Sequence, residues 1–415
     1  MQETGFGDQP ISEKVDPIIT RKNRPSDRQQ VSKLNTIMFE DPGISIIMPA
    51  LNEEVTIGSC IRGIQELFAA NQICGEIIVS DSSTDNTASI AQSLNALVIH
   101  PAKPGYGNAY LEAFQYSKHS IIVMMDSDGT YNASEILQLI GPIKTGADLV
   151  IGSRFKGKIH PGAMTPLHRY IGNPLLTLVL NLVFHTYFSD AHSGFRAIRR
   201  EAMDKLHLKT GGMEFASEML VMASKKGLKI EEVPTTYFPR KTPSNLHSFA
   251  DGWRHLRFIL LMKPVPFLAI PGLIFSVLGV LLMTLFYLNG DIETSHLHSF
   301  ILGSILLIGG VQVITMGVNT EVYSIIHGYQ EKSRIMATFL NYHSLEKYLI
   351  IGGALIFVGI ILGISVLLQW INANFGEISQ ISTSVVALTL IVIGIQVISC
   401  SIFISMMLLN DGIEV

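Results

Sequence analysis

The chain has 415 residues, of which 48% are hydrophobic and 15% are charged, and its formal net charge is −4. This composition argues against a nucleic-acid-binding protein and is unusual for a soluble enzyme. The basic residues are unevenly spread, because only three of the 30 lysines and arginines (Lys332, Arg334 and Lys347) lie beyond residue 263. The chain therefore divides into a charged, globular first part and a strongly apolar last part.

The first 40 residues are polar and lack the apolar core of a signal peptide. They predict a flexible arm with a short helix near residues 27–34. Cys60, Cys74 and Cys400 show no metal-ligand spacing, and a cytoplasmic domain would keep them reduced.

Apolar runs alternate with amphipathic segments between residues 44 and 152. The expected strands are 44–48, 76–80, 96–99, 121–126 and 149–152. The expected helices are 56–70, 87–94, 107–117 and 134–140. Strands and helices that alternate at this spacing predict a parallel, doubly wound sheet.

Two carboxylates directly follow the fourth apolar run, at Asp126 and Asp128. Side chains two residues apart on a strand share a face, and open α/β sheets bind ligands at the carboxyl ends of their strands. Two hard oxygen ligands there suit Mg²⁺ or Mn²⁺ held together with substrate phosphates. The alternative is a solvated loop cap, since Asp-Ser-Asp-Gly is also good turn chemistry.

Polar residues also follow the first two strands, at Asn52, Glu53 and Asp81. Strand ends that converge on one edge favour a nucleotide site, although each residue alone could be a helix cap. No Gly-x-Gly-x-x-Gly motif follows the first strand and no Walker-type Gly-Lys-Ser occurs, which argues against a nicotinamide enzyme and a P-loop nucleotidase.

The last part contains four apolar stretches long enough to cross a bilayer, which takes about 20 residues. They lie near 264–288, 300–320, 348–370 and 382–409. The connecting segments 289–299 and 371–381 have no lysine or arginine, whereas 321–347 carries all three of the basic residues beyond 263. By the positive-inside rule, the loop 321–347, the globular domain and the C-terminus are expected on the cytoplasmic side.

A basic amphipathic segment, residues 249–263, leads into the first expected span. Trp253 is flanked by Arg254 and Arg257 in this segment. This pattern predicts an interfacial helix, with the tryptophan at headgroup level and the arginines near lipid phosphates.

Eight motifs now follow one another in the order of a known family. They are Pro49-Ala-Leu-Asn-Glu53, Asp81-Ser-Ser-Thr-Asp85-Asn-Thr87, Gly105-Tyr-Gly-Asn-Ala109, Met125-Asp-Ser-Asp-Gly-Thr-Tyr131, Ile151-Gly-Ser-Arg154-Phe, Asp190-Ala-His-Ser-Gly-Phe-Arg196, Met213-Glu-Phe-Ala-Ser-Glu218 and Asp251-Gly-Trp-Arg-His-Leu-Arg257. Over about residues 44–262 the chain resembles family 2 glycosyltransferases of GT-A fold, in the branch of dolichol-phosphate mannose synthase-like, polyprenyl-phosphate glycosyltransferases.

The resemblance implies an α/β GT-A domain at residues 41–248, and the four apolar stretches predict an all-α transmembrane domain of four helices at 264–415. It implies transfer of a single sugar from GDP-mannose, UDP-glucose or UDP-N-acetylglucosamine to dolichyl or undecaprenyl phosphate, with inversion and release of nucleoside diphosphate. The expected location is a prokaryotic cell membrane or the endoplasmic reticulum. A processive polysaccharide synthase and a non-catalytic membrane scaffold are the alternatives, although the Gln-x-x-Arg-Trp motif of such synthases is absent. A homo-oligomer is left open.

The same resemblance assigns roles to individual residues. The residues that would bind the nucleotide-sugar are Pro49, Ala50, Asn52, Glu53, Asp81, Asp126 and Glu218. Those that would hold Mg²⁺ or Mn²⁺ are Asp126, Asp128 and Thr130. Those that would contact the acceptor phosphate are Arg154, Arg240, Lys241 and Arg254. The catalytic set is Asp128, Arg154, Arg196 and Arg240.

Two positions depart from the family pattern. Thr130 stands where many members have a metal-contacting glutamine, and Asn245 stands where the acceptor motif has a lysine, which Lys241 could replace. Structural ion pairs remain the alternative for the arginines. For Glu218 the alternative is a hydrogen-bond partner in the core.

Overall fold

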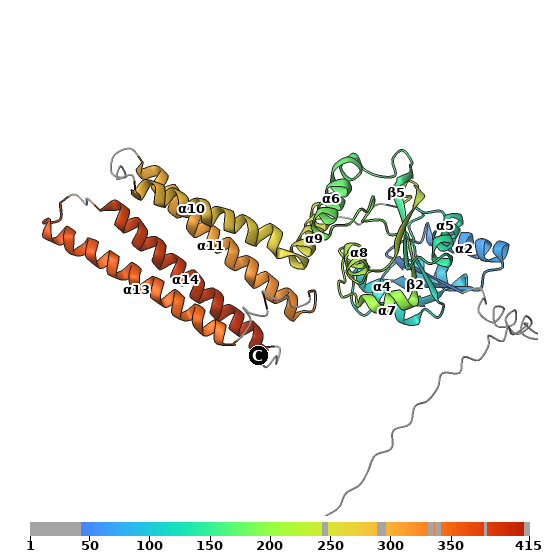
Figure 1. Cartoon of the computed structure of the whole chain (residues 1–415). Helices are drawn as coiled ribbons and strands as arrows, with labels where there is room; N and C mark the ends of the chain where they lie inside the picture. Colours follow the sequence, from blue (N-terminus) through green and yellow to red (C-terminus); the bar gives the residue numbers. More distant parts are fainter. Residues whose placement is uncertain are drawn as a thin grey trace, which may run out of the picture.

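The structure is a computed structural model that describes residues 43–242, 248–288, 296–330, 336, 342–376 and 380–410. An α/β domain is followed by a set of long apolar helices (Figure 1). The helix expected near residues 27–34 and the position of Asn245 lie outside the described residues.

The α/β domain is built on a seven-stranded sheet of order β3-β2-β1-β4-β6-β5-β7. Its strands are β1 (Ile44–Ala50), β2 (Gly75–Asp81), β3 (Leu97–Ile99), β4 (Ile121–Met124), β5 (Leu149–Ile159), β6 (Arg196–Arg199) and β7 (Ile230–Tyr237). β1 lies in parallel between β2 and β4, whereas β6 runs antiparallel to both β4 and β5. The expected α/β fold is therefore confirmed as a mostly parallel sheet. The sequence prediction of a parallel sheet included neither β6 nor β7.

Helices cover both faces of this sheet. They are α2 (Ile57–Asn71), α3 (Thr87–Ser93), α4 (Tyr106–Tyr116), α5 (Ile136–Lys144), α6 (Asn173–Phe184), α7 (Arg200–Leu206) and α8 (Phe215–Lys225). The first four match expected helices within a few residues, with a 3-10 turn at Ala133–Glu135 before α5. The 160–225 region, which holds α6, α7 and α8, was not anticipated.

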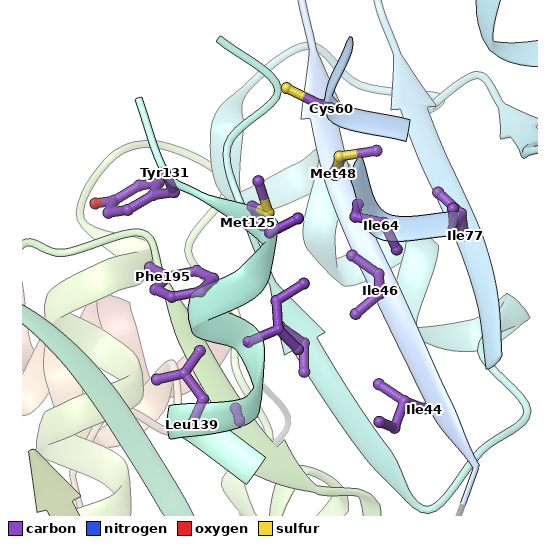
Figure 2. Packing of buried hydrophobic residues seen from close by; sticks show 14 of the residues in the cluster. Ile44, Ile46, Met48, Cys60, Ile64, Ile77, Met125, Tyr131, Leu139 and Phe195 are labelled. Carbon is purple, nitrogen blue, oxygen red and sulfur yellow. The ribbon is translucent and has the colours of Figure 1, made fainter. Parts of the chain in front are cut away.

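Successive residues of the central strands enter opposite cores, because side chains alternate along a strand. Ile46 belongs to one buried cluster with residues of α2 and α5; Figure 2 shows Ile64 of α2 beside it and Leu139 of α5 at the far side of the cluster. Its neighbour Ile47 packs on the other face with side chains of α4, α6 and α8. The sheet is buried on both sides, which explains the unbroken apolar runs of β1 and β4.

Four helices are long and apolar enough to cross a membrane, at Val265–Tyr287, Leu297–Ile326, Glu346–Asn372 and Ile381–Leu408. They correspond to α10 (Ile270–Leu288) with the π-turn before it, and to α11 (Leu297–Ile326), α13 (Tyr342–Asn372) and α14 (Ile381–Asn410). Each predicted span coincides with one of these helices, although α11 and α13 extend into the segment 321–347, for which the sequence predicts a loop.

Helix α9 (Ser248–Met262) joins the two parts of the molecule. Its Phe258, Ile259 and Met262 are buried in the same core as α6 and α8. The Ser324 hydroxyl of α11 donates a hydrogen bond to the Leu261 carbonyl. The core that α6, α8 and α9 share is therefore joined directly to the first two long apolar helices.

Candidate active site

The ends of β1, β2 and β4 bring the predicted carboxylates to one edge of the sheet. Ala50 pairs with Asp81 at the last position of β1 and β2, and Ile47 pairs with Met124 at the end of β4. Asp126 follows only two residues beyond Met124. The convergence expected from the sequence is present.

Asp126 lies in a closely fitted setting that the sequence did not reveal. The Tyr106 hydroxyl at the start of α4 donates to Asp126 Oδ1 at 3.1 Å. A Cβ at Gly194 would lie 2.6 Å from Asp126 Oδ2, so this position leaves no space for a side chain. Burial, with the charge of Asp128, raises the pKa of Asp126 to about 7.

The two oxygens of Asp128, which is 6% exposed, have different partners. Oδ1 accepts hydrogen bonds from the Thr130 amide at 3.0 Å and from the Thr130 hydroxyl at 2.6 Å. Oδ2 lies 2.9 Å from Nε of Arg240. The hydroxyl of Thr130, a predicted metal ligand, is thus directed at Asp128 and fixes the orientation of that carboxylate.

Arg240 connects Asp128 with Glu53. Its Nη2 donates to Glu53 Oε1 at 2.7 Å. Glu53 Oε2 accepts from the hydroxyls of Thr56 at 3.0 Å and Thr242 at 2.9 Å. Burial opposes the charge of Arg240, but Asp128 and Glu53 outweigh it and raise the arginine pKa. Glu53, predicted as a nucleotide ligand, here anchors the segment that follows β7.

The loops after β1 and β2 are held to each other by side-chain hydrogen bonds. Asn52 has a left-handed backbone with φ 58°, and its Oδ1 accepts from the Thr84 amide at 2.9 Å. The backbone N–H of Asn52 in turn donates a hydrogen bond to Ser83 Oγ at 2.7 Å. Asp85 accepts from the amide of Thr87 at 3.0 Å. Asn52 therefore holds the loop after β1 against the loop after β2.

Asp81 has an unsatisfied acceptor. The residue is only 2% exposed, yet its Oδ1 has no hydrogen-bond partner among the described residues. A buried acceptor without a donor is costly, so a ligand with N–H or O–H groups would be favoured there. The backbone carbonyls of Pro49 and Ala50 already accept hydrogen bonds, from Ser127 Oγ and the Ser82 amide.

Arg154 and Arg196 both have internal partners. Arg154 makes a bidentate ion pair with Asp190, at 2.7 Å from Nε and 2.8 Å from Nη2. Arg196 is 1% exposed and donates to the carbonyls of Ser193, Ala216 and Ala191. These contacts match the structural alternative for the two arginines, and they fix the loop that carries Gly194.

Glu218 is likewise a hydrogen-bond partner within the fold. Its carboxylate accepts from the amides of Lys209 and Thr210 and from the Thr210 hydroxyl. Burial raises the pKa of Glu218. Lys241 and Arg254, the other predicted acceptor-phosphate residues, are exposed, and Arg254 lies on α9.

Tyr106 and Gly194 are the site residues that the sequence analysis did not identify. Both belong to motifs quoted above, Gly105-Tyr-Gly and Ser-Gly-Phe-Arg, but neither motif has a chemical signature of its own. Tyr106 lies 20 positions before Asp126 and Gly194 lies 68 positions after it, so the fold has to bring these segments together.

The donor set fits a small divalent cation that also binds phosphate. The described residues contain no group of three or more His, Cys, Asp or Glu side chains that could hold a metal alone. Two carboxylates, Asp126 and Asp128, are what Mg²⁺ or Mn²⁺ needs when substrate phosphates and water complete the coordination. The guanidinium of Arg240 beside Asp128 indicates that this carboxylate attracts a cation.

The α/β domain also carries one apolar surface, which we call the α6 stripe. Its members are spaced three or four residues apart along α6 and the turns before it: Leu167, Ile171, Leu175, Leu178 and Leu182. Each is more than half exposed. α6 packs against α9, between the sheet and the membrane helices (Figure 1).

Two segments of the chain match models of known protein families. Residues 45–207 match the model for glycosyl transferase family 2, and residues 318–408 match that for the glycosyltransferase family 2 C-terminal transmembrane region.

Individual relatives are similar to most of the chain or to about half of it. The low-salt glycan biosynthesis hexosyltransferase Agl6 of Haloferax volcanii is 39% identical over 361 residues, which cover 86% of this chain and 87% of that protein. A dolichyl-phosphate hexose transferase of the same organism is 30% identical, over 52% of this chain and 90% of its own length. The polyprenol monophosphomannose synthase of Mycolicibacterium smegmatis is 28% identical, over 47% and 77%. Among solved structures, a Mycobacterium tuberculosis glucosyl-3-phosphoglycerate synthase is 25% identical, covering 59% of this chain and 84% of its own, with a TM-score of 0.42.

Proposed function

The chain belongs to glycosyltransferase family 2, and from this premise we propose that it transfers one hexose from a nucleotide-sugar to a polyprenyl phosphate at the cytoplasmic membrane face. The protein is a glycosyltransferase and an integral membrane protein. The donor, the acceptor, the metal and the orientation in the membrane are the proposed parts. The observation that carries them is the carboxylate pair Asp126 and Asp128, placed at the strand edge that also holds the unsatisfied Asp81.

The nucleoside would lie over the ends of β1 and β2. Asp81 Oδ1 would accept from an N–H or O–H of the nucleoside, which satisfies the buried oxygen. Asn52, already fixed by Thr84, would shape the adjoining wall. The diphosphate would then extend toward Asp126 and Asp128. These residues follow β4, the strand that pairs with β1.

Asp126 and Asp128 would hold the Mg²⁺ or Mn²⁺. When bound, such an ion supplies charge stabilisation to the departing nucleoside diphosphate. Tyr106 and Thr130 keep the two carboxylates in place through their hydroxyl groups. Preorganised contacts of this kind need no rearrangement as charge develops.

The acceptor needs positioning more than activation. A phosphate monoester is ionised near neutral pH, so its oxygen can attack the sugar carbon without a strong general base. In a single displacement, the new C–O bond forms on the face opposite the leaving group, and the bond to the nucleoside diphosphate breaks. Arg240 and the exposed Lys241 and Arg254 would contact the acceptor phosphate.

Two surfaces support an acceptor that stays in the membrane. α9 leads directly into the first span, and the α6 stripe offers apolar side chains beside it. The only lysines and arginines beyond 263 are Lys332, Arg334 and Lys347. They lie between the second span and the start of the third, which favours the cytoplasmic side for the α/β domain.

A transfer assay tests the proposal. The full chain in proteoliposomes with dolichyl or undecaprenyl phosphate is offered radiolabelled GDP-mannose, UDP-glucose and UDP-N-acetylglucosamine, each with and without MgCl₂. We expect label from one donor to appear in organic-extractable lipid only with the divalent cation. Absence of lipid label with every donor and both acceptors would contradict the proposal.

A further inference from the structure

The cation beside Asp128 in this structure is an arginine. Asp128 Oδ1 already accepts two hydrogen bonds from Thr130, so Oδ2 is the oxygen left for a metal. That oxygen has Arg240 Nε at 2.9 Å. Arg240 therefore occupies the position beside Asp128 Oδ2 that a bound metal ion would take.

A metal and Arg240 cannot share this oxygen at low cost. Mg²⁺ binds carboxylate oxygens at about 2.1 Å. With Nε 2.9 Å from the same oxygen, the ion and the guanidinium would be at most about 5 Å apart. Two positive charges this close, beside largely buried carboxylates, repel each other strongly. The bound ion therefore favours movement of the guanidinium.

The guanidinium is also held on its other side. Glu53 is 3% exposed, accepts from Arg240 Nη2 at 2.7 Å, and binds the Thr242 hydroxyl with its second oxygen. Glu53 thus ties residues 240 to 242 to the loop after β1. Release of the Asp128 contact frees one of the two anchors of this segment.

We propose that Arg240 neutralises Asp128 in the ligand-free enzyme and is displaced when the metal and the nucleoside diphosphate bind together. This inference rests on the proposed function, because it takes Asp128 as a metal ligand and Arg240 as a later partner of the acceptor phosphate. The nucleoside diphosphate adds its own negative charge around the ion, which offsets the loss of the Arg240 contact. Metal alone lacks this compensation and binds weakly.

The test is Mn²⁺ binding by the full chain in nanodiscs, followed by the electron paramagnetic resonance signal of free Mn²⁺, with no sugar donor present. In the natural protein we expect weak Mn²⁺ binding alone and much tighter binding with GDP or UDP. The Arg240→Gln variant should bind Mn²⁺ alone at least about tenfold more tightly, because the competing cation is gone. The gain from the nucleoside diphosphate should shrink accordingly.

Lys241→Gln is the matched control, since it removes the same charge one residue away. We expect its Mn²⁺ affinity to stay within about twofold of the natural protein, because an exposed charge is screened by solvent. Arg240→Lys, which keeps the charge, should remain close to the natural protein. Thermal unfolding of each variant reports whether it is folded.

The outcomes separate this inference from the proposed function. Mn²⁺ binding in the natural protein with no gain in Arg240→Gln overturns the displacement alone. An equal gain in Lys241→Gln also overturns it, since the effect would then be one of general charge. No Mn²⁺ binding in any variant, with or without a nucleoside diphosphate, overturns both.

Discussion

The α/β domain and the membrane helices are packed by opposite kinds of residue. In the α/β domain large side chains such as Ile46 and Ile122 are fully buried. Among the membrane helices many large side chains face outward, with Leu273 57% and Ile350 70% exposed, and glycines form close contacts between helices. A Cβ at Gly310 would lie 2.6 Å from the Gly272 carbonyl oxygen. The hydrophobic effect drives the burial of large side chains in the α/β domain. Close approach of helix backbones stabilises the membrane helices, where lipid replaces water.

Because the two regions are packed differently, we expect substitutions in them to have different effects. In the α/β domain, the site consists of polar groups placed by a rigid core, so changes there should affect activity more than folding. In the membrane helices, changes should affect assembly. The following predictions test this contrast, from the largest expected effect to the smallest.

Asp126→Asn should lower the transfer rate by at least about a hundredfold, because it removes charge where the leaving group is stabilised. The amide oxygen can still accept from Tyr106, and a buried charge is lost, so the melting temperature should not fall. Rates from the lipid-transfer assay and thermal unfolding of the same preparation measure the two effects. Full activity in this variant would remove Asp126 from the site.

Gly310→Ala should destabilise the membrane helices by about 2 to 3 kcal/mol, since the new methyl group would meet backbone atoms of α10. The matched control is Gly309→Ala, where nothing lies within 4 Å of the added Cβ. That variant should be neutral or slightly more stable, because alanine favours a helix. Thermal unfolding in detergent measures both, and equal behaviour would contradict the close packing of α10 and α11.

Acidification should destabilise the junction between the α/β domain and α9. The rings of His192 and His255 lie 4.4 Å apart, and burial, with the charge of Arg196, lowers the pKa of His255 to about 4. Burial and the charge of His255 also lower the pKa of His192. The folded state keeps His255 neutral while the unfolded chain takes up a proton near pH 6.5. Stability is therefore full above pH 6.5 and falls as the pH drops toward 4.

At pH 5 the loss from His255 amounts to about 2 kcal/mol relative to pH 7. His255→Asn can still pair with Ser217 and does not titrate, so its melting temperature should fall less between pH 7 and pH 5. An identical fall in both proteins would show that His255 is not responsible.

The α6 stripe should behave like a membrane helix although it belongs to the α/β domain. Leu178→Asp should raise the KM for polyprenyl phosphate in proteoliposomes about fivefold, the effect of losing about 1 kcal/mol of apolar contact with lipid. The control is Leu137→Asp on α5, another exposed leucine, which should leave KM unchanged. In a separate variant whose natural Trp253 and Trp370 are replaced by phenylalanine, the fluorescence of Leu178→Trp should be quenched by brominated lipid. Without such quenching, the stripe would not be a lipid contact.

Much of this arrangement could be predicted from local sequence. The first five strands, the four apolar stretches and the pair Asp126 and Asp128 were predicted from short patterns, namely apolar runs and the residues that end them, whereas β7 was not predicted. The antiparallel strand β6, Arg196–Arg199, was missed because only four residues form it and two are arginines.

The partners of the polar residues could not be predicted in the same way. Arg240 and Glu53 are 187 positions apart, and Arg154 and Asp190 are 36 apart, so only the fold brings them together. Burial then decides which arginine is available to a ligand, and burial of a single side chain has no local sequence signal.

The most direct test of the single-sugar transfer is the product itself. Full-length protein in proteoliposomes is supplied with excess polyprenyl phosphate and the active nucleotide-sugar, and the lipid is analysed by mass spectrometry while nucleoside diphosphate is counted. We expect lipid phosphate carrying one hexose, with one nucleoside diphosphate released for each sugar transferred. Lipid carrying a polymer, sugar released into water, or no product at all would contradict this function.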